Sequence, residues 1–180
     1  MSRVADMHRE GSPRHLSFTV IVVSDTRFKQ SQRGEAIHDE TTPLIKRILR
    51  RQRYKLLTSE IVPDQKNAVK DTIVKHIDKH HPHVIILSGG TGISPRDITY
   101  EVVKELISKQ IDGFGELFRW LSYHDIGTAA MLSRTIAGIH KKTLIISLPG
   151  SPDAVKLAME KLIIPEVGHI INLIHEVGKE

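Results

Sequence analysis

Apolar runs and helix-like segments alternate along the first two thirds of the chain. Residues 18–23 and 84–87 are continuous apolar runs rich in β-branched side chains, a pattern typical of strands covered on both faces. Apolar side chains also recur at helical spacing, as Val69, Ile73 and Ile77 do. The pattern predicts strands at 18–23, 56–62 and 84–87 and helices that begin near 43, 67 and 99, with Thr42 and Thr99 as caps.

The pattern changes after residue 111. Four of the eight aromatic residues lie within residues 113–123, which predicts a cluster buried in the core or between subunits. Residues 134–139 and 143–147 are strand-like and are joined by a short polar turn, so we expect an antiparallel edge element. A helix is predicted to begin after Ser151, and Pro165 should divide it from a last helix that ends near residue 176.

This alternation predicts an α/β fold. We expect a three-layer αβα sandwich with a mostly parallel sheet and an antiparallel edge element. Residues 1–16 are polar and without periodicity, which indicates a flexible N-terminal tail before a single domain at 17–180. Residues 25–39 are expected to form a polar loop.

The composition suits one ordinary globular domain, with 180 residues, 39% hydrophobic and 26% charged. The sequence contains no cysteine, which excludes a disulfide scaffold, a thiolate nucleophile and cysteine-ligated zinc or iron–sulfur centres. No apolar run approaches the roughly 20 residues of a membrane span, and no signal-peptide core is present. We therefore expect a soluble protein in the cytoplasm, with no membrane partner.

The chain carries a formal net charge of +5, which favours anionic ligands. Its densest basic run, at residues 46–55, lies at the end of a predicted helix, where cations also suit the helix dipole. Single-stranded nucleic acids are usually bound on aromatic platforms, but this run contains one aromatic residue, Tyr54. Nucleic acid is therefore a minor alternative and not the expected partner.

A glycine-rich turn directly follows the strand predicted at 84–87. Glycines allow a tight turn and leave successive N–H groups free to bind a phosphate. The spacing matches neither the P-loop nor the dinucleotide fingerprint, and a purely structural turn explains the glycines equally well. The turn consists of Ser88, Gly89, Gly90, Thr91 and Gly92.

Carboxylates follow three consecutive strands, at Asp25, Asp64 and Asp97. The carboxyl ends of parallel strands share one edge of a sheet, so these acids could converge around a magnesium–phosphate group. Arg96 could clamp phosphate oxygens beside them. The alternative is that the acids cap helices, with Ser94 as the cap in the case of Asp97.

Other polar clusters have simpler explanations. His76 and His80 have the spacing of paired metal ligands on a helix, but cationic side chains are common at a helix end and we favour that interpretation. Pro149, Gly150 and Ser151 precede a predicted helix, where free N–H groups can receive an anion.

At these positions the sequence resembles the MoaB/Mog family of molybdenum cofactor biosynthesis proteins, which includes the G domain of gephyrin. The resemblance rests on short motifs in one order over about residues 18–167. They are VSDTR at 23–27, VPD at 62–64, SGGTG at 88–92, PRDIT at 95–99, GFGELFR at 113–119, SR at 133–134, AG at 137–138 and LPGSP at 148–152.

The resemblance implies that the protein binds molybdopterin and transfers AMP from Mg-ATP to its terminal phosphate, releasing pyrophosphate. It makes Asp64 and Asp97 the catalytic pair and the residues that hold Mg²⁺ through ATP. The expected substrate and phosphate contacts are Ser24, Asp25, Arg27, Ser88, Gly89, Gly90, Thr91, Gly92, Arg96, Glu101, Pro149, Gly150 and Ser151.

The sequence departs from the family pattern at two places. Residues 39–42 stand where an Asp-x-Ser-Gly element is common, and Tyr100 replaces a proline. The aromatic stretch is closer to the MoaB branch, which implies a homohexamer, with a trimer as second choice, and a molybdenum insertase is a further expected partner. The alternative function is a noncatalytic molybdopterin-binding or scaffolding protein, although both aspartates of the catalytic pair are present.

Overall fold

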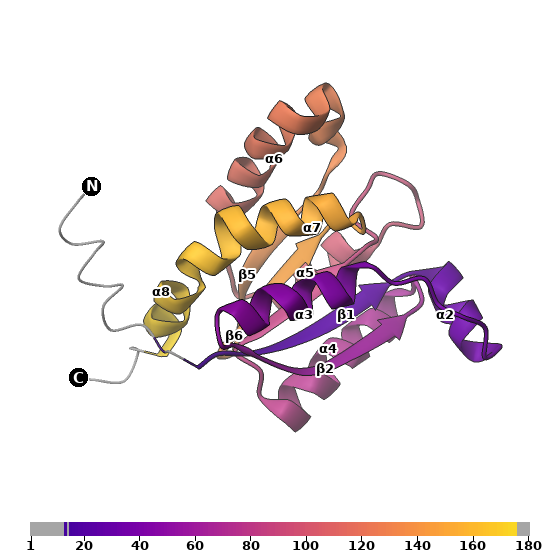
Figure 1. Ribbon diagram of the computed structural model, residues 1–180, viewed down its shortest axis with the longest axis horizontal. Coiled ribbons are helices and arrows are strands. Elements are labelled where there is room, and N and C mark those ends of the chain that lie inside the picture. The colour runs from indigo at the N-terminus through magenta and orange to yellow at the C-terminus, as the bar shows by residue number, and fades with distance from the viewer. Residues whose placement is uncertain (1–12, 14, 176–180) are drawn as a thin grey trace.

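Within residues 15–175, six strands form one sheet between two layers of helices (Figure 1). The computed structural model describes residue 13 and residues 15–175. The strand order is β2-β1-β3-β6-β5-β4; the first four strands are parallel, and β5 and β4 run antiparallel to their neighbours. The strands are β1 (Ser17–Val23), β2 (Lys55–Val62), β3 (Val84–Ser88), β4 (Lys109–Gln110), β5 (Ile136–His140) and β6 (Thr143–Leu148).

The helices pack against both faces of the sheet, which confirms the predicted αβα sandwich (Figure 1). Phe18 and Val20 of β1 face one layer and Ile21 faces the other, because side chains alternate along a strand. One layer contains α3 (Thr41–Arg51), α6 (Asp112–Ile126), α7 (Pro152–Ala158) and α8 (Ile164–His175), and the other contains α4 (Lys66–His80) and α5 (Thr99–Leu106).

The helix α2 (Asp25–Gln32) occupies the first half of the segment that we expected to be a loop. The prediction was wrong there because α2 buries none of its described residues and therefore has no apolar stripe to reveal it. Ser24 begins the helix: its hydroxyl accepts the backbone N–H of Arg27 at 3.3 Å.

The caps predicted at Thr42 and Thr99 were also wrong. Thr42 lies inside α3, whose first N–H groups, on Thr41 and Thr42, donate to Oδ1 of Asp39 at 3.0 and 3.2 Å. A carboxylate is the stronger acceptor for these positively polarised groups. Thr99 is the first residue of α5, one position beyond the capping residue, Ile98. By contrast, Ser151 caps α7 as predicted, at 3.3 Å from the N–H of Ala154.

The C-terminal helices join through a single wide turn. Between α7 and α8 lies η2 (Met159–Ile163), a π-helical segment, and Pro165 is the second residue of α8. Proline lacks an N–H and collides with the carbonyl of the preceding turn, so the break predicted at Pro165 takes the form of a π-helical turn.

The antiparallel edge element consists of β5 and β4. In the hairpin predicted from residues 134–147, β5 pairs with β6, but β6 is itself internal to the sheet because it also pairs with β3. The two-residue strand β4 forms the edge. Most of the tail predicted at 1–16 lies outside the described residues; its last residue, Leu16, is buried, and its carbonyl accepts the N–H of Lys55 at 2.8 Å.

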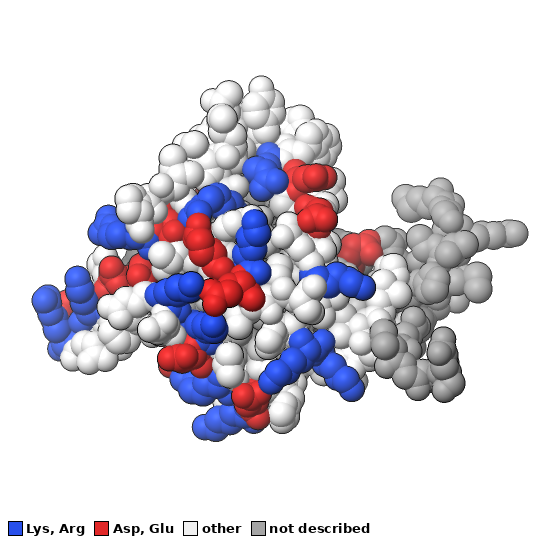
Figure 2. Space-filling view, turned by 180° about the vertical axis from the view of Figure 1, so that it is seen from behind, with Lys and Arg blue, Asp and Glu red and all other residues white. Residues whose placement is uncertain are grey.

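Charges of both signs are interspersed over the face shown in Figure 2. Ion pairs join α4 to β2 and to α5. Lys75 lies 2.6 Å from Glu60, and Lys66 and Lys70 lie 2.8 and 3.0 Å from Glu105. The hydrogen bonds from these two lysines lower the pKa of Glu105 to about 2. None of the described helices combines the length and the apolar character needed to cross a bilayer.

Candidate active site

The carboxyl ends of β1, β2, β3 and β6 lie at the same edge of the sheet. The strand register pairs Val23 with Val62 and Ser88 with Leu148. Just beyond these pairs, the N–H of Gly89 donates to the carbonyl of Leu148 at 2.9 Å. The loops that carry the predicted site residues therefore start next to one another, as ligand-binding loops do in open α/β sheets.

Asp25 and Asp64 connect the first two of these loops. The N–H of Asp25 donates to Oδ2 of Asp64 at 3.0 Å, and the N–H of Asp64 donates to Oδ1 of Asp25 at 3.0 Å. Because each carboxylate binds the other residue's backbone, both side chains are held in place. The structure thus brings together two of the three acids that were predicted to converge.

The environment of Asp64 opposes its ionisation. Burial raises the pKa of the Asp64 carboxyl, and the negative charges of Asp25 and Asp97 raise it further. The hydrogen bond from Asp25 and the positive charge of Arg96 act in the opposite direction. A bound cation would favour the ionised form of Asp64.

The glycine-rich turn passes directly over Asp64. Gly90 has a φ of +63°, and a Cβ at this position would lie 2.4 Å from Oγ1 of Thr99 and 2.9 Å from Oδ1 of Asp64. Gly89 has a φ of +108°, and a Cβ there would lie 2.3 Å from the carbonyl oxygen of Val23. Both positions need glycine for conformation and for space. The backbone can thereby approach the carboxylate closely.

The N–H groups of this turn are available to a ligand. Among the described residues, none accepts a hydrogen bond from the N–H of Gly90, Thr91 or Gly92. The hydroxyl of Thr99 is fully buried and also has no partner among the described residues. Buried polar groups are normally hydrogen-bonded, so the buried hydroxyl of Thr99 lacks its usual partner, while Gly90 and Gly92 are only half-buried and their N–H groups are open to water or a ligand.

Asp97 lies at the end of an exposed turn that begins at Gly92. Its Oδ2 accepts the N–H of Ser94 at 2.9 Å, and a Cβ on Gly92 would lie 2.9 Å from the same oxygen. No helix begins at Pro95, because residues 94–98 form a turn and α5 starts at Thr99. The alternative in which Ser94 caps a helix is therefore wrong, and Asp97 closes a turn beside Asp64 instead.

Comparison with known proteins identifies the family. The family described as "Probable molybdopterin binding domain" matches residues 19–169. The chain belongs to this molybdopterin-binding family.

Relatives in this family are similar over nearly their whole length. Molybdenum cofactor biosynthesis protein B of Bacillus subtilis (strain 168) is 40% identical over 170 residues, which cover 94% of this chain and 96% of the relative. A protein of Methanocaldococcus jannaschii named "Probable molybdopterin adenylyltransferase" is 38% identical over 163 residues, covering 91% and 96%.

Solved structures of the family have the same fold. The crystal structure of a molybdenum cofactor biosynthesis protein B has a TM-score of 0.82 at 40% identity, covering 91% of this chain and 98% of that chain. The tungsten cofactor synthesizing protein MoaB from Pyrococcus furiosus has a TM-score of 0.80 at 38% identity, covering 92% and 100%. The resemblance expected from the sequence motifs is thus confirmed.

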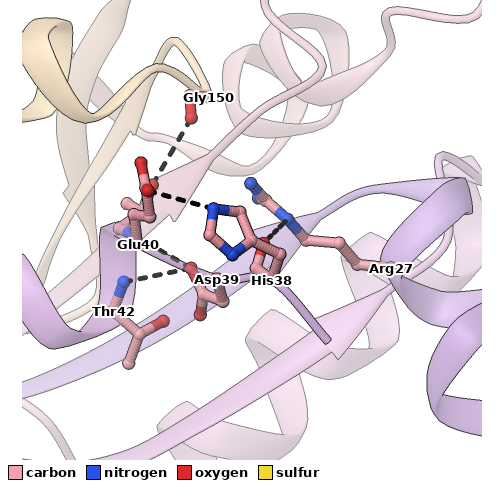
Figure 3. Close-up of polar contacts among 7 residues, drawn as sticks. Arg27, His38, Asp39, Glu40, Thr42 and Gly150 are labelled. Atoms are coloured by element: carbon pink, nitrogen blue, oxygen red, sulfur yellow. Dashed lines mark hydrogen bonds and ion pairs between the residues drawn. The ribbon is translucent and has the colours of Figure 1, made fainter. Parts of the chain in front are cut away.

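The structure gives protein partners to several residues predicted to contact substrate in this molybdopterin-binding domain. Ser24 and Ser151 cap α2 and α7. The Nε of Arg27 donates to the carbonyl of His38 at 3.2 Å (Figure 3), and Glu101 pairs with Arg134. Their contact with substrate stays a prediction.

The LPGSP segment packs against both the glycine turn and the loop before α3. Ser88 donates from its hydroxyl to the carbonyl of Pro149 at 3.3 Å, and a Cβ on Gly150 would lie 3.5 Å from the Cα of Gly89. Thr41 donates from its hydroxyl to the carbonyl of Gly150 at 3.4 Å. The role of Asp39 was left open by the sequence. By capping α3, it holds in place the helix start that contacts the LPGSP segment.

The sequence analysis did not assign Arg134 to the site. Its side chain reaches Gly92, Asp97 and Glu101, which are more than 30 residues away in the sequence. The SR motif at 133–134 was a signal for this residue, but its contacts depend on how β5 packs beside the glycine turn. Tyr100 replaces a family proline. Its ring lies beneath the guanidinium, and the ring centre is 5.4 Å from the Cζ of Arg134.

The donor set fits a magnesium ion that is also bound by phosphates. In the described part of the chain, no group of three or more His, Asp or Glu side chains is arranged to hold a metal ion. Mg²⁺ is usually bound by one or two carboxylates together with substrate phosphates and water. Asp64 and Asp97 could supply the two carboxylates. The His76–His80 pair is stacked, and Nε2 of His76 lies 2.8 Å from Glu60.

Proposed function

We propose that this protein transfers AMP from ATP to the terminal phosphate of molybdopterin, with Mg²⁺ held by Asp64 and Asp97. The observation that carries the proposal is the position of the Asp64 carboxylate, fixed by the backbone of Asp25 and covered by the glycine turn beside Asp97. The Methanocaldococcus jannaschii relative, named as a probable molybdopterin adenylyltransferase, supports the same reaction.

The reaction requires little acid or base chemistry from the protein. An oxygen of the pterin phosphate attacks the α-phosphorus of ATP, the bond from that phosphorus to the bridging oxygen breaks, and pyrophosphate leaves with the electron pair. The second pKa of a phosphate monoester is about 6, so the nucleophile is mostly dianionic at neutral pH. A site without a Ser–His pair is therefore adequate.

The residues of this chain would act by bringing two anionic substrates together. When bound, Mg²⁺ would neutralise part of the phosphate charge. The N–H groups of Gly90, Thr91 and Gly92 are suited to phosphate oxygens, and the exposed Arg96 adds a positive charge in the same region. Fixed donors of this kind stabilise charge without reorganising during the reaction.

We also propose that the protein is a homohexamer, with a trimer as the second choice. Large apolar side chains on α6 and on the following 3-10 helix η1 (Gly127–Leu132) are exposed in the single chain, and an exposed patch of this kind usually marks an interface. This assembly patch consists of Leu117, Trp120, Tyr123, Ile126, Met131 and Leu132.

Two further expectations belong to the same proposal. A molybdenum insertase is the expected consumer of the adenylylated pterin, because an activated phosphate is prepared for a following step. We place the protein in the cytoplasm because a chain without cysteine suits a reducing compartment.

The test is direct. Purified protein is incubated with Mg-ATP and molybdopterin, and the adenylylated pterin and pyrophosphate are measured in parallel. Asp78→Asn is a matched control. Asp78 is an exposed acid outside the catalytic pair, and its carboxylate lies 3.0 Å from the Nζ of Lys141. Saturable pterin binding without either product would favour the noncatalytic molybdopterin-binding protein instead.

A further inference from the structure

The turn from Gly92 to Asp97 has little support of its own. Residues 93–96 are exposed and belong to no helix or strand. Within the turn, the N–H of Asp97 donates to the carbonyl of Ser94 at 2.9 Å, and the N–H of Ser94 donates to the Asp97 carboxylate. These short-range bonds shape the turn but do not attach it to the sheet. Its attachment must come from elsewhere in the chain.

Arg134 provides that attachment at both ends of the turn. Its Nε donates to the carbonyl of Gly92 at 2.6 Å, and its Nη2 donates to the carbonyl of Asp97 at 2.8 Å. The third nitrogen, Nη1, pairs with the carboxylate of Glu101 in the first turn of α5. One planar group therefore joins the start of the turn, its end and the following helix.

The backbone of Arg134 is itself held against the glycine turn. Its N–H donates to the carbonyl of Thr91 at 3.0 Å. The preceding carbonyl, of Ser133, accepts Nη1 of Arg119 at 3.4 Å, and β5 begins two residues later, at Ile136. The guanidinium thus extends from a segment that the sheet holds in place.

The contacts of the guanidinium distinguish positioning from substrate binding. All three of its nitrogens bind acceptors of the protein, and the face of the group lies over the ring of Tyr100. Arg96, in contrast, is exposed, and its guanidinium makes no hydrogen bond or ion pair with the residues that the structure describes. The two arginines therefore have different surroundings.

We propose that Arg134 is a positioning residue that acts through Asp97, by clamping the Gly92–Asp97 turn against the sheet. This inference rests on the proposed transfer of AMP for its kinetic test, but the clamp itself is a structural claim. A lysine at this position would keep the positive charge and lose the planar fork that reaches three acceptors at once.

The experiment combines kinetics with hydrogen exchange. Arg134→Ala, Arg134→Lys, Asp97→Asn and the double variant Asp97→Asn/Arg134→Ala are assayed for kcat and for KM with Mg-ATP and with molybdopterin. We expect Arg134→Ala to lower kcat by about tenfold or more, with a smaller change in the KM for the pterin. Arg134→Lys should restore little of this loss, because the loss follows from geometry and not from charge.

The double variant decides whether Arg134 acts through Asp97. If it does, the double variant should be no slower than Asp97→Asn within about twofold, since removing the clamp matters only while the carboxylate is present. Multiplicative losses would overturn the proposal and make Arg134 a group that acts on the substrate itself. Wild-type turnover in Arg134→Lys would overturn it as well.

Hydrogen exchange tests the clamp independently of any activity. In Arg134→Ala the backbone amides of Ser94 and Asp97, which are hydrogen-bonded within the turn, should exchange about tenfold faster or more, while those of β1 stay protected. Lys104→Ala is the matched control, because Lys104 is the second cation over Tyr100, at 5.6 Å from the ring centre, and its removal should change neither measurement. Unchanged exchange at Ser94 and Asp97 would refute the clamp, whereas faster exchange in a protein without transferase activity would refute only the proposed function.

Discussion

Asp25 and Asp64 each accept a hydrogen bond from the other residue's backbone N–H, at 3.0 Å in both directions. The N–H of Asp25 binds Oδ2 of Asp64, while Oδ1 of Asp64 faces the glycine turn near Thr99. An asparagine at position 64 could keep the oxygen that binds Asp25 and would lose only the charge. The site therefore allows the charge and the position of residue 64 to be tested separately.

Asp64→Asn should lower turnover by at least about tenfold at neutral pH, because it removes a charge from the proposed Mg-ATP site. The thermal midpoint should be equal to or higher than that of the wild type, because a half-buried charge is removed while the hydrogen bond survives. Turnover and thermal unfolding are measured on the same preparations, beside Asp78→Asn. Wild-type turnover would remove Asp64 from the catalytic pair.

The stability difference between this variant and the wild type should depend on pH. Because the folded-state pKa of Asp64 is raised above its usual value, the folded wild type binds its proton more readily than the unfolded chain does. Its stability relative to Asp64→Asn should therefore improve as the pH falls from neutral toward about 4, the usual pKa of an aspartate. Paired thermal scans over this range check the sign, and a gap that widens on acidification would contradict it.

Gly90→Ala should abolish turnover and destabilise the fold, because its Cβ would collide with Oγ1 of Thr99 and crowd Asp64. Gly34→Ala is the matched control: φ is +67° at Gly34 and +63° at Gly90, but nothing lies within 4 Å of a Cβ at Gly34. Both variants share a backbone cost of about 1–2 kcal/mol. Urea unfolding should show a further loss in the free energy of unfolding for Gly90→Ala alone. Equal losses in the two variants would mean that the turn accommodates the added methyl group without strain.

Trp120→Glu and Met131→Glu should dissociate the proposed homohexamer. These side chains are 61% and 75% exposed in the single chain, so a charge at either position costs little in a monomer and much in an apolar interface. Light scattering over a dilution series measures the mass, and circular dichroism verifies that the variants fold. A wild type that is monomeric and fully active would refute the assembly, while a stable trimer would refute only the hexamer.

Stability should also fall when His83 becomes protonated. The Nδ1 of His83 accepts the backbone N–H of Ser17 at 3.1 Å, and burial, followed by the nearby charge of His175, lowers the pKa of His83. The unfolded chain therefore binds the proton more readily, and folded-state stability should decrease as the pH falls below about 6.5. In His83→Asn the amide oxygen can replace Nδ1 as acceptor, so the slope of midpoint against pH should become shallower between pH 7 and 5. An unchanged slope would mean that other titrating groups cause the loss of stability below pH 7.

The sequence predicted the regular part of the fold well because its signals are local. The apolar runs of β1 and β3 and the helical spacing in α4 are visible in adjacent residues, and the structure confirms them. The helix α2 was missed because it buries no described residue. Caps were misplaced by one or a few residues, since several oxygen-bearing side chains near Thr42 compete for the same N–H groups.

The candidate site divides in the same way. The sequence by itself determined that glycines follow β3 and that an aspartate follows each of three strands, and the parallel sheet then requires these ends to meet at one edge. Only the tertiary structure decided that Asp25 holds Asp64 and that Arg134 clamps the turn ending in Asp97. Such pairings join residues about 40 positions apart, and their geometry is set by the packing of whole elements, which no local pattern encodes.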